Sequence, residues 1–145
     1  MEVLIDNRQS NHQIPLEALQ EMAKALLNAL DNPEGELSIL IVDDPQIAEL
    51  NAEYLNREGP TNVISFPMGS GSFPNITPHL LGDVVISADT AFKEGKSGEI
   101  GLEERLKQLL IHGVLHLFDY DHEEPEEAVE MDKKSEELLL KLKQL

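Results

Sequence analysis

The stretch LLIHGVLHLFDYDH, residues 109–122, holds three of the chain's five histidines and decides where the core lies. Its first ten residues are apolar on nearly all sides of a helix, which predicts a helix buried in the centre of the protein. His112 and His116 are four residues apart, so they lie one turn apart on the same helix face. The helix then has to end, and the turn that follows ends in His122.

Three histidines at this spacing indicate a binding site for a divalent metal ion. Imidazole nitrogens bind zinc at about 2.0–2.1 Å, and three of them without cysteine leave a position open for water or substrate. The alternative is three polar residues that are only packed and hydrogen-bonded, but burying unpaired imidazoles is costly. We therefore predict one Zn²⁺ per chain on His112, His116 and His122. Nickel, copper and iron also accept imidazole ligands.

The same spacing occurs in the metzincin proteases, whose motif is H-E-x-x-H-x-x-G-x-x-H. In that motif the residue after the first histidine is a glutamate that serves as the general base. Gly113 stands at this position here, and a glycine cannot accept a proton. The spacing therefore predicts a zincin-like three-histidine site, while the missing base argues against peptidase chemistry.

The composition narrows the class of protein. A length of 145 residues and a hydrophobic content of 41% suit one domain, residues 1–145, with one core. The chain has no cysteine, which excludes thiolate zinc sites and is typical of a cytoplasmic protein. No apolar run approaches the roughly 18 residues of a membrane span, so no membrane contact is expected. A net charge of −17 should repel polyanions, so any nucleic-acid contact has to be local.

Strand and helix patterns alternate irregularly along the chain, which favours an α+β fold. The expected strands are 3–7, 37–42, 61–66 and 83–87; the expected helices are 14–30, 43–55, 88–95, 101–118 and one that begins at Pro125. Asp44 is the expected cap of the second helix. We expect one mixed β-sheet packed with helices, with a long Gly/Pro-rich loop at 67–82.

Three sequence blocks resemble the YbeY family, bacterial single-strand endoribonucleases that act in rRNA maturation. The family signature is approximately H-G-x-L-H-L-x-G-Y-D-H, and residues 112–122 are HGVLHLFDYDH. A second block, approximately L-N-x-x-Y-R-x-x-x-x-P-T-[DN]-V-[LI]-S-F-P, corresponds to LNAEYLNREGPTNVISFP at residues 50–67. A third is LLGDVVIS at residues 80–87. The residues before Leu50 match the family only in the order of their elements.

The resemblance implies a zinc-like ion on the three histidines, in a cleft beside the sheet, with Asp83 near the metal. It also implies a metal-dependent endoribonuclease whose substrate is single-stranded RNA. The implied setting is maturation of the 3′ end of 16S rRNA and ribosome quality control in the cytoplasm. The small ribosomal subunit or its proteins would then be the partners.

Two residues depart from the family pattern. Asp119 stands where the family has a glycine, just past a helix end where a left-handed backbone is often needed. Aspartate tolerates that conformation better than most residues. Leu55 stands where the family has an arginine suited to phosphate binding. Arg57, two residues further on, is either a replacement phosphate ligand or a solvated loop residue.

Two carboxylates, Asp83 and Asp121, are candidate catalytic residues together with Arg57. Each carboxylate could accept a proton or orient a ligating histidine through its second ring nitrogen. The alternative for Asp121 is a cap or turn residue, and for Asp83 a strand-entry residue bonded to nearby backbone. His12 and His79 are expected to be solvent-exposed rather than ligands.

The only local excess of basic residues follows the fourth expected strand and has two interpretations. It either solubilises helix faces or forms a phosphate track. Its members are Lys93, Lys96, Arg105 and Lys107.

Three functions remain open on the sequence alone. The first is the endoribonuclease, which rests on the three blocks. The second is another zinc hydrolase such as a peptidase, which Gly113 opposes. The third is a metal-stabilised ribosome-assembly factor that binds without cleaving; Leu55 and the acidic surface favour it, because such a surface would need a basic protein or a shielded RNA as partner.

Overall fold

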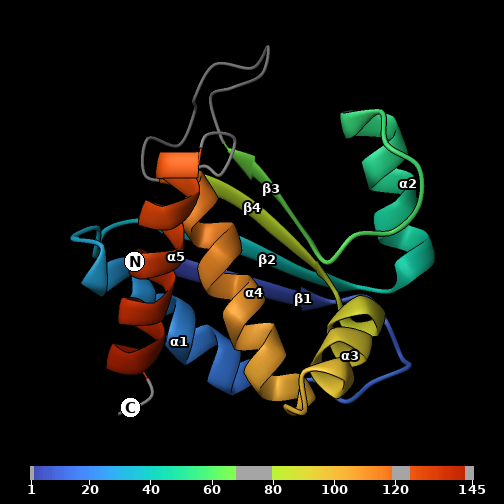
Figure 1. Cartoon of the computed structure of the whole chain (residues 1–145), viewed down its shortest axis with the longest axis horizontal. Coiled ribbons are helices and arrows are strands. Elements are labelled where there is room, and N and C mark those ends of the chain that lie inside the picture. The colour runs from blue at the N-terminus through green and yellow to red at the C-terminus, as the bar shows by residue number, and fades with distance from the viewer. Residues whose placement is uncertain (1, 68–79, 119–124, 143–145) are drawn as a thin grey trace.

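The computed structural model describes residues 2–67, 80–118 and 125–142 (Figure 1). Its centre is a four-stranded sheet in the order β1-β2-β4-β3. β1 (Glu2–Asn7), β2 (Glu36–Val42) and β4 (Leu80–Ser87) are parallel, and β3 (Val63–Pro67) pairs antiparallel with β4 at one edge. The prediction of an α+β fold with one mixed sheet and packed helices is confirmed.

The helices cover the two faces of this sheet unequally. Figure 1 shows α1 (Leu16–Ala29), α4 (Leu102–Leu117) and α5 (Pro125–Leu142) gathered on one side. These helices and the sheet face they cover form the main hydrophobic cluster. α2 (Asp44–Leu55) lies apart from them and packs a smaller cluster, built on Ile47 and Val85, against the opposite face. α3 (Ala88–Ser97) follows β4 directly and packs beside α4.

The cap of α2 differs from the sequence prediction. The N-cap is Asp43, whose side chain accepts a hydrogen bond from the backbone N–H of Gln46 at 3.0 Å. Asp44 is instead the first helical residue, and its Oδ1 accepts hydrogen bonds from the hydroxyl groups of Ser87 and Thr90, each at 2.6 Å. Asp44 therefore joins α2 to the N-terminus of α3 rather than capping its own helix.

His12 also differs from its expected exposure, because it is half-buried in a polar cluster with Asp89. Its Nε2 lies 2.9 Å from Asp89 Oδ1, and its ring lies 5.0 Å from that of Phe92. The other oxygen of Asp89 accepts from the backbone N–H of Asp44 at 2.9 Å. The cluster thus connects the chain before α1 with the first turns of α2 and α3.

We expect the Asp44–Asp89 cluster to make the fold acid-sensitive. Burial raises the pKa of Asp44, but hydrogen bonds from Ser87, Thr90 and Lys93 outweigh it and lower the pKa below its ordinary 3.8. The hydrogen bond from the Asp44 N–H lowers the pKa of Asp89. Because both pKa values are lowered, this stabilisation is complete above about pH 4 and is lost as the pH falls through the folded-state values.

Replacing Asp89 by Asn should therefore lower the free energy of unfolding by about 1–3 kcal/mol at pH 7, because a neutral amide replaces the charged acceptor that Asn11, His12 and the Asp44 N–H contact. Urea titrations of both proteins between pH 7 and pH 2 would measure the difference. It should shrink as the wild-type carboxylate is protonated. A difference that stays constant down to pH 2 would contradict this assignment.

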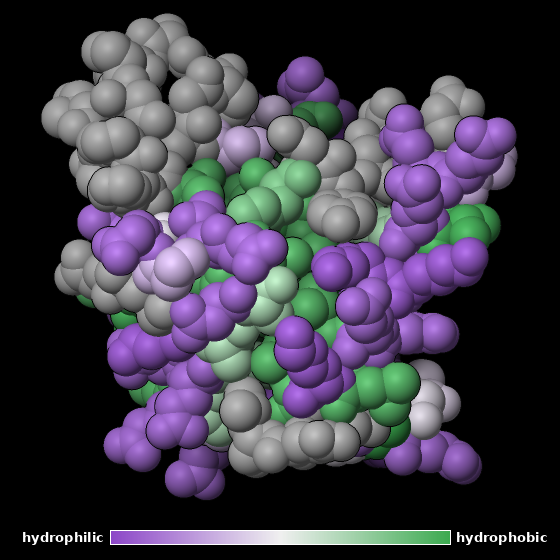
Figure 2. Space-filling view, turned by 90° about the vertical axis from the view of Figure 1, so that its left-hand side faces the viewer, coloured by the Kyte–Doolittle hydropathy of each residue, from purple (hydrophilic) through white to green (hydrophobic). Residues whose placement is uncertain are grey.

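The surface on the side of α1 and α5 is mainly hydrophilic. Figure 2 shows the face at the left of Figure 1, where hydrophilic residues surround a band of hydrophobic ones. None of the helices in the described parts of the chain is long and apolar enough to cross a membrane.

Candidate active site

α4 brings His112 and His116 together on one face, as the four-residue spacing predicts. Their Nε2 atoms lie 3.1 Å apart, and the ring centroids are 4.7 Å apart with the planes at 80°. Both residues are half-buried, while the neighbouring Ile111, Val114 and Leu115 are fully buried. The two imidazoles therefore emerge from the buried helix at a surface that a ligand can reach.

This geometry fits two ligands of one metal ion. Two nitrogens at about 2.05 Å from an ion with tetrahedral angles are about 3.3 Å apart, close to the distance between the two Nε2 atoms. The same distance also suits a hydrogen bond between two neutral rings, one donating and one accepting. Among the described residues no group of three potential metal ligands occurs. His122, the predicted third ligand, lies outside the described residues.

Close packing of α4 on β3 and β4 determines how far His112 and His116 lie from the sheet. A Cβ added at Gly113 would lie 2.6 Å from Val84 Cγ1 and 3.1 Å from Val63 Cγ2, so only glycine permits this approach. Ser65 of β3 donates a hydrogen bond from its hydroxyl group to the carbonyl oxygen of Gly113 at 2.7 Å. Gly113 is therefore a contact residue of the sheet, and a metzincin-like glutamate would not fit there.

The histidine pair opens into a groove of ≈ 520 Å³ between α4, the edge strand β3 and the segment after α2. We call it the histidine groove. Its lining residues are Leu55, Arg57, Thr61, Asn62, Val63, Ile64, Ser65, Pro67, His112 and His116. The structure therefore brings Arg57 into the same groove as His112 and His116. A role for Arg57 as a phosphate ligand requires this placement.

Local backbone structure explains how Arg57 reaches the groove. Asn56 ends α2 in the left-handed conformation, at φ 53° and ψ 38°, which asparagine tolerates well. The backbone N–H of Arg57 then donates to the carbonyl oxygen of Asn51 at 3.2 Å, and the Asn51 side chain donates to that of Gly59 at 2.9 Å. Asn51 thus holds both sides of the loop that carries Arg57.

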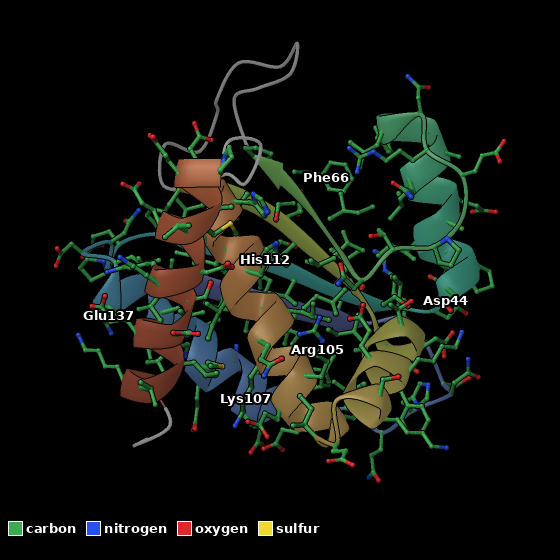
Figure 3. All side chains as sticks on the ribbon, viewed as in Figure 1. Asp44, Phe66, Arg105, Lys107, His112 and Glu137 are labelled. Atoms are coloured by element: carbon green, nitrogen blue, oxygen red, sulfur yellow. The ribbon has the colours of Figure 1, made fainter. Side chains whose placement is uncertain are left out.

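Asp83 is not brought to the histidines. Side chains alternate along β4, and Asp83 has the same orientation as Val85, which packs with Ile64 and Ile47 on the α2 face. Its cross-strand partner Phe66 points toward α2 and away from His112 in Figure 3. This orientation does not favour a direct proton transfer between Asp83 and the histidine groove, and the place of Asp83 near the metal stays a prediction.

The remaining sequence candidates divide into those outside the described residues and those engaged elsewhere. Asp119, Asp121 and His79 lie outside the described residues. The predicted basic track is largely paired with carboxylates: Lys93 with Asp44 at 3.0 Å, Arg105 with Glu94 at 2.9 Å, and Lys107 with Glu103 at 3.3 Å. These pairs argue against a phosphate track and favour the alternative, that the basic residues solubilise helix faces, with three of them also paired to carboxylates.

Two residues that position the groove were not identified from the sequence. Ser65 and Asn51 position the two walls of the groove through bonds to the backbone, Ser65 to α4 and Asn51 to the Arg57 loop. Both residues stand inside the second block quoted above. The signal that could have found them is a small polar residue in an apolar element, because such a residue needs a partner when buried.

Comparison with known proteins supports the family inferred from the three blocks. The family model described as Endoribonuclease YbeY matches residues 4–143, so the match includes the residues before Leu50. The Endoribonuclease YbeY of Syntrophotalea carbinolica is 46% identical over 97% of this chain and 95% of its own length. That of Geobacter metallireducens is 48% identical over 88% of this chain and 85% of its own length.

A solved structure shows the same fold at lower sequence identity. The solution structure of TM1509 from Thermotoga maritima superposes with a TM-score of 0.65 at 23% identity, covering 94% of this chain and 86% of that one. The family-model match and the identities to these relatives lead to one conclusion: the chain belongs to the YbeY endoribonuclease family.

Proposed function

We propose that this protein is a metal-dependent endoribonuclease that cleaves single-stranded RNA in the histidine groove. The observation that carries the proposal is the presence of the His112–His116 pair and Arg57 in one groove, in a chain whose relatives are named endoribonucleases. Phosphodiester cleavage needs a metal ion or another group that polarises the phosphate and a positive charge that stabilises the transition state. The two histidines could hold such an ion, and the guanidinium of Arg57 is such a charge.

His112 and His116 would hold a divalent ion, and His122 is the proposed third ligand. Zn²⁺ is the first choice because three imidazoles without thiolates are typical of catalytic zinc; nickel, copper and iron are accepted by the same ligands. When bound, the ion supplies Lewis-acid polarisation of the scissile phosphate. Asp121 is the remaining carboxylate candidate for accepting a proton or orienting a histidine, since Asp83 faces the other side of the sheet.

Arg57 would bind a phosphate of the RNA strand. Its guanidinium carries a permanent positive charge and presents donors that match phosphate oxygens. The edge strand β3 forms the opposite part of the wall, with Ser65 bonded to α4. A single strand can lie in this groove, whereas the net charge of −17 repels a duplex from the rest of the surface.

The biological substrate that fits this proposal is rRNA, at the 3′ end of 16S rRNA, during maturation and quality control of the ribosome in the cytoplasm. The support is the family membership together with the acidic surface, which favours a basic protein partner. Proteins of the small ribosomal subunit are such partners. Binding without cleavage is the second candidate function, favoured by Leu55 in place of the family arginine.

One assay separates these functions. The zinc-loaded protein is incubated with single-stranded RNA, with the same RNA as a duplex, and with casein. Cleavage of the single strand alone supports the proposal. Cleavage of casein would favour a peptidase, and intact RNA together with binding to small ribosomal subunits would favour the assembly factor.

Arg57→Ala should weaken binding of single-stranded RNA severalfold and reduce the slope of log K against log salt by about 0.7, the contribution of one phosphate contact. Fluorescence anisotropy at several salt concentrations measures both quantities. Arg8→Ala is the matched control, because Arg8 is exposed, pairs with Asp6, and follows β1 at the other edge of the sheet. Equal salt slopes in the wild type and Arg57→Ala would remove Arg57 from the RNA contact.

A further inference from the structure

The face of α4 that carries the two histidines continues beyond the histidine groove. Arg105, Gln108, His112 and His116 are spaced by three and four residues, so they form one stripe along the helix. The stripe is about 16 Å long at 1.5 Å per residue. Figure 3 shows Arg105 and His112 on the same helix, with α5 on one side of it. The histidine groove is therefore continued along α4 by the side chains of Gln108 and Arg105.

A second hollow, of ≈ 450 Å³, lies along this stripe between α4 and α5. Asn62 and His112 line both this hollow and the histidine groove, so the two cavities adjoin at these residues. We call it the α4–α5 hollow. Its volume falls in the range of about 300–1,000 Å³ found for small-molecule sites. A strand bound at the histidines thus has a nearby cavity of a size that can accept one of its bases.

The two sides of His112 differ in charge. On the β3 side, the histidine groove contains Arg57 and no carboxylate among its described lining residues. On the α5 side, the hollow contains the exposed carboxylates Asp132 and Glu136, four residues apart on one face of α5. Carboxylates repel phosphates but accept hydrogen bonds from base N–H groups. The charge distribution therefore orients a strand with its backbone toward β3 and a base toward α5.

The floor and end of the hollow also suit a base. Leu109 and Leu139 supply apolar surface. Arg105 is held by hydrogen bonds to Glu94 at 2.9 and 3.1 Å and to Gln108 Oε1 at 2.7 Å. Three of its five N–H donors are engaged in this way and its charge is paired with Glu94, which leaves stacking of the guanidinium plane as a contact available to a base. The Nε2 group of Gln108 is a donor beside it.

We propose that the α4–α5 hollow binds an unpaired guanine next to the scissile phosphate of a single-stranded RNA. The Watson–Crick edge of guanine presents N1–H and N2–H donors to the carboxylates of Asp132 and Glu136, and its O6 accepts from Gln108. Uracil has one such donor, between two acceptors that would face carboxylates. This inference rests on the proposed function for its substrate, single-stranded RNA. It adds a preference for guanine, which depends on Asp132 and Glu136 of α5.

Binding of short RNA strands tests the proposal. The probes are uridine oligomers that carry one G, A or C at successive positions, with anisotropy for affinity and gel mapping for cleavage. We expect one guanine position to improve binding about tenfold or more over uridine, as a carboxylate–base pair does. Cleavage should occur beside that guanine.

The decisive variant is Asp132→Asn/Glu136→Gln, and both residues are exposed, so the fold should be retained. It should bind the oligomers without guanine more tightly, because two negative charges are gone, and it should lose the guanine preference. The matched control is Glu130→Gln/Glu137→Gln, which removes two exposed carboxylates from the opposite face of α5. Figure 3 shows Glu137 directed away from α4. The control should also gain affinity and keep the preference.

The outcomes separate this inference from the proposed function. A wild type that cleaves single-stranded RNA with no base preference, or a hollow variant that keeps the preference, overturns the base subsite. A wild type that prefers guanine in binding and cleaves nothing supports the subsite and contradicts the nuclease assignment.

Discussion

His116→Ala is expected to reduce cleavage of single-stranded RNA by at least about 100-fold and to abolish stoichiometric metal binding. The Nε2 atoms of His112 and His116 are 3.1 Å apart, so removal of either ring takes away one of two nitrogens that could bind the same ion. His116 is half-buried on the groove side of α4 and lies outside the main hydrophobic cluster. The variant should therefore keep its helical content while losing activity. Metal analysis, circular dichroism and a single-turnover cleavage assay would measure the three quantities.

The matched control for this change is His12→Ala. His12 is a histidine of similar burial that contacts Asp89 and Phe92 rather than the groove. It should lose stability but retain metal binding and cleavage. If His12→Ala and His116→Ala lose activity to the same degree, the loss reflects folding, and the assignment of His116 as a ligand fails.

Gly113→Ala should lower the free energy of unfolding by about 1–3 kcal/mol, the cost of overpacking a filled interface. Alanine is favoured over glycine inside a helix by about 1 kcal/mol, so intrinsic propensity alone predicts the opposite sign. Steric overlap prevails here because the new Cβ would lie 2.6 Å from Val84 Cγ1 on the central strand β4. Urea unfolding monitored by circular dichroism gives the difference directly.

Gly101→Ala provides the control for Gly113→Ala, since nothing lies within 4 Å of a Cβ at Gly101. Its effect should stay below about 1 kcal/mol and reflect only the position of Gly101 at the N-cap of α4, where glycine is preferred to alanine. Gly113→Glu should be still less stable than Gly113→Ala and should not acquire peptidase activity, because the carboxylate would be forced against the sheet. A Gly113→Ala protein as stable as the wild type would show that α4 lies further from β3 and β4 than described.

The order of the elements and the histidine pair could be predicted from the sequence because both depend on local periodicity. The apolar pattern around residues 109–118 defines a buried helix, and a four-residue spacing necessarily places His112 and His116 on one face. The strands followed from β-branched runs, although β4 begins at Leu80 rather than Asp83.

The orientation of Asp83 could not be predicted in this way. β4 lies between β2 and β3 and is covered on both faces, so Val84, Val85 and Ile86 are all buried and give no alternation to show which face is which. A register shift between Glu36 and Leu37, opposite the start of β4, adds a further break in the pattern.

Long-range contacts decided the other differences. Asp43 and Asp44 are equally good caps by sequence, and the choice depends on Ser87 and Thr90, which are more than forty residues away along the chain. The meeting of Arg57 with the histidines likewise depends on how the segment after α2 passes along β3. Neither the hydrogen bonds around Asp44 nor the histidine groove can be recognised from a short stretch of sequence.

X-ray absorption at the zinc edge of the stoichiometrically loaded full chain tests the central claim most directly. The account predicts about one zinc per chain with imidazole-type scattering from three rings at about 2.0–2.1 Å. His122→Ala should reduce the ring scattering to that of two rings. A spectrum with only oxygen ligands, or one that is unchanged in a His112→Ala/His116→Ala protein, would contradict a metal site built on this pair.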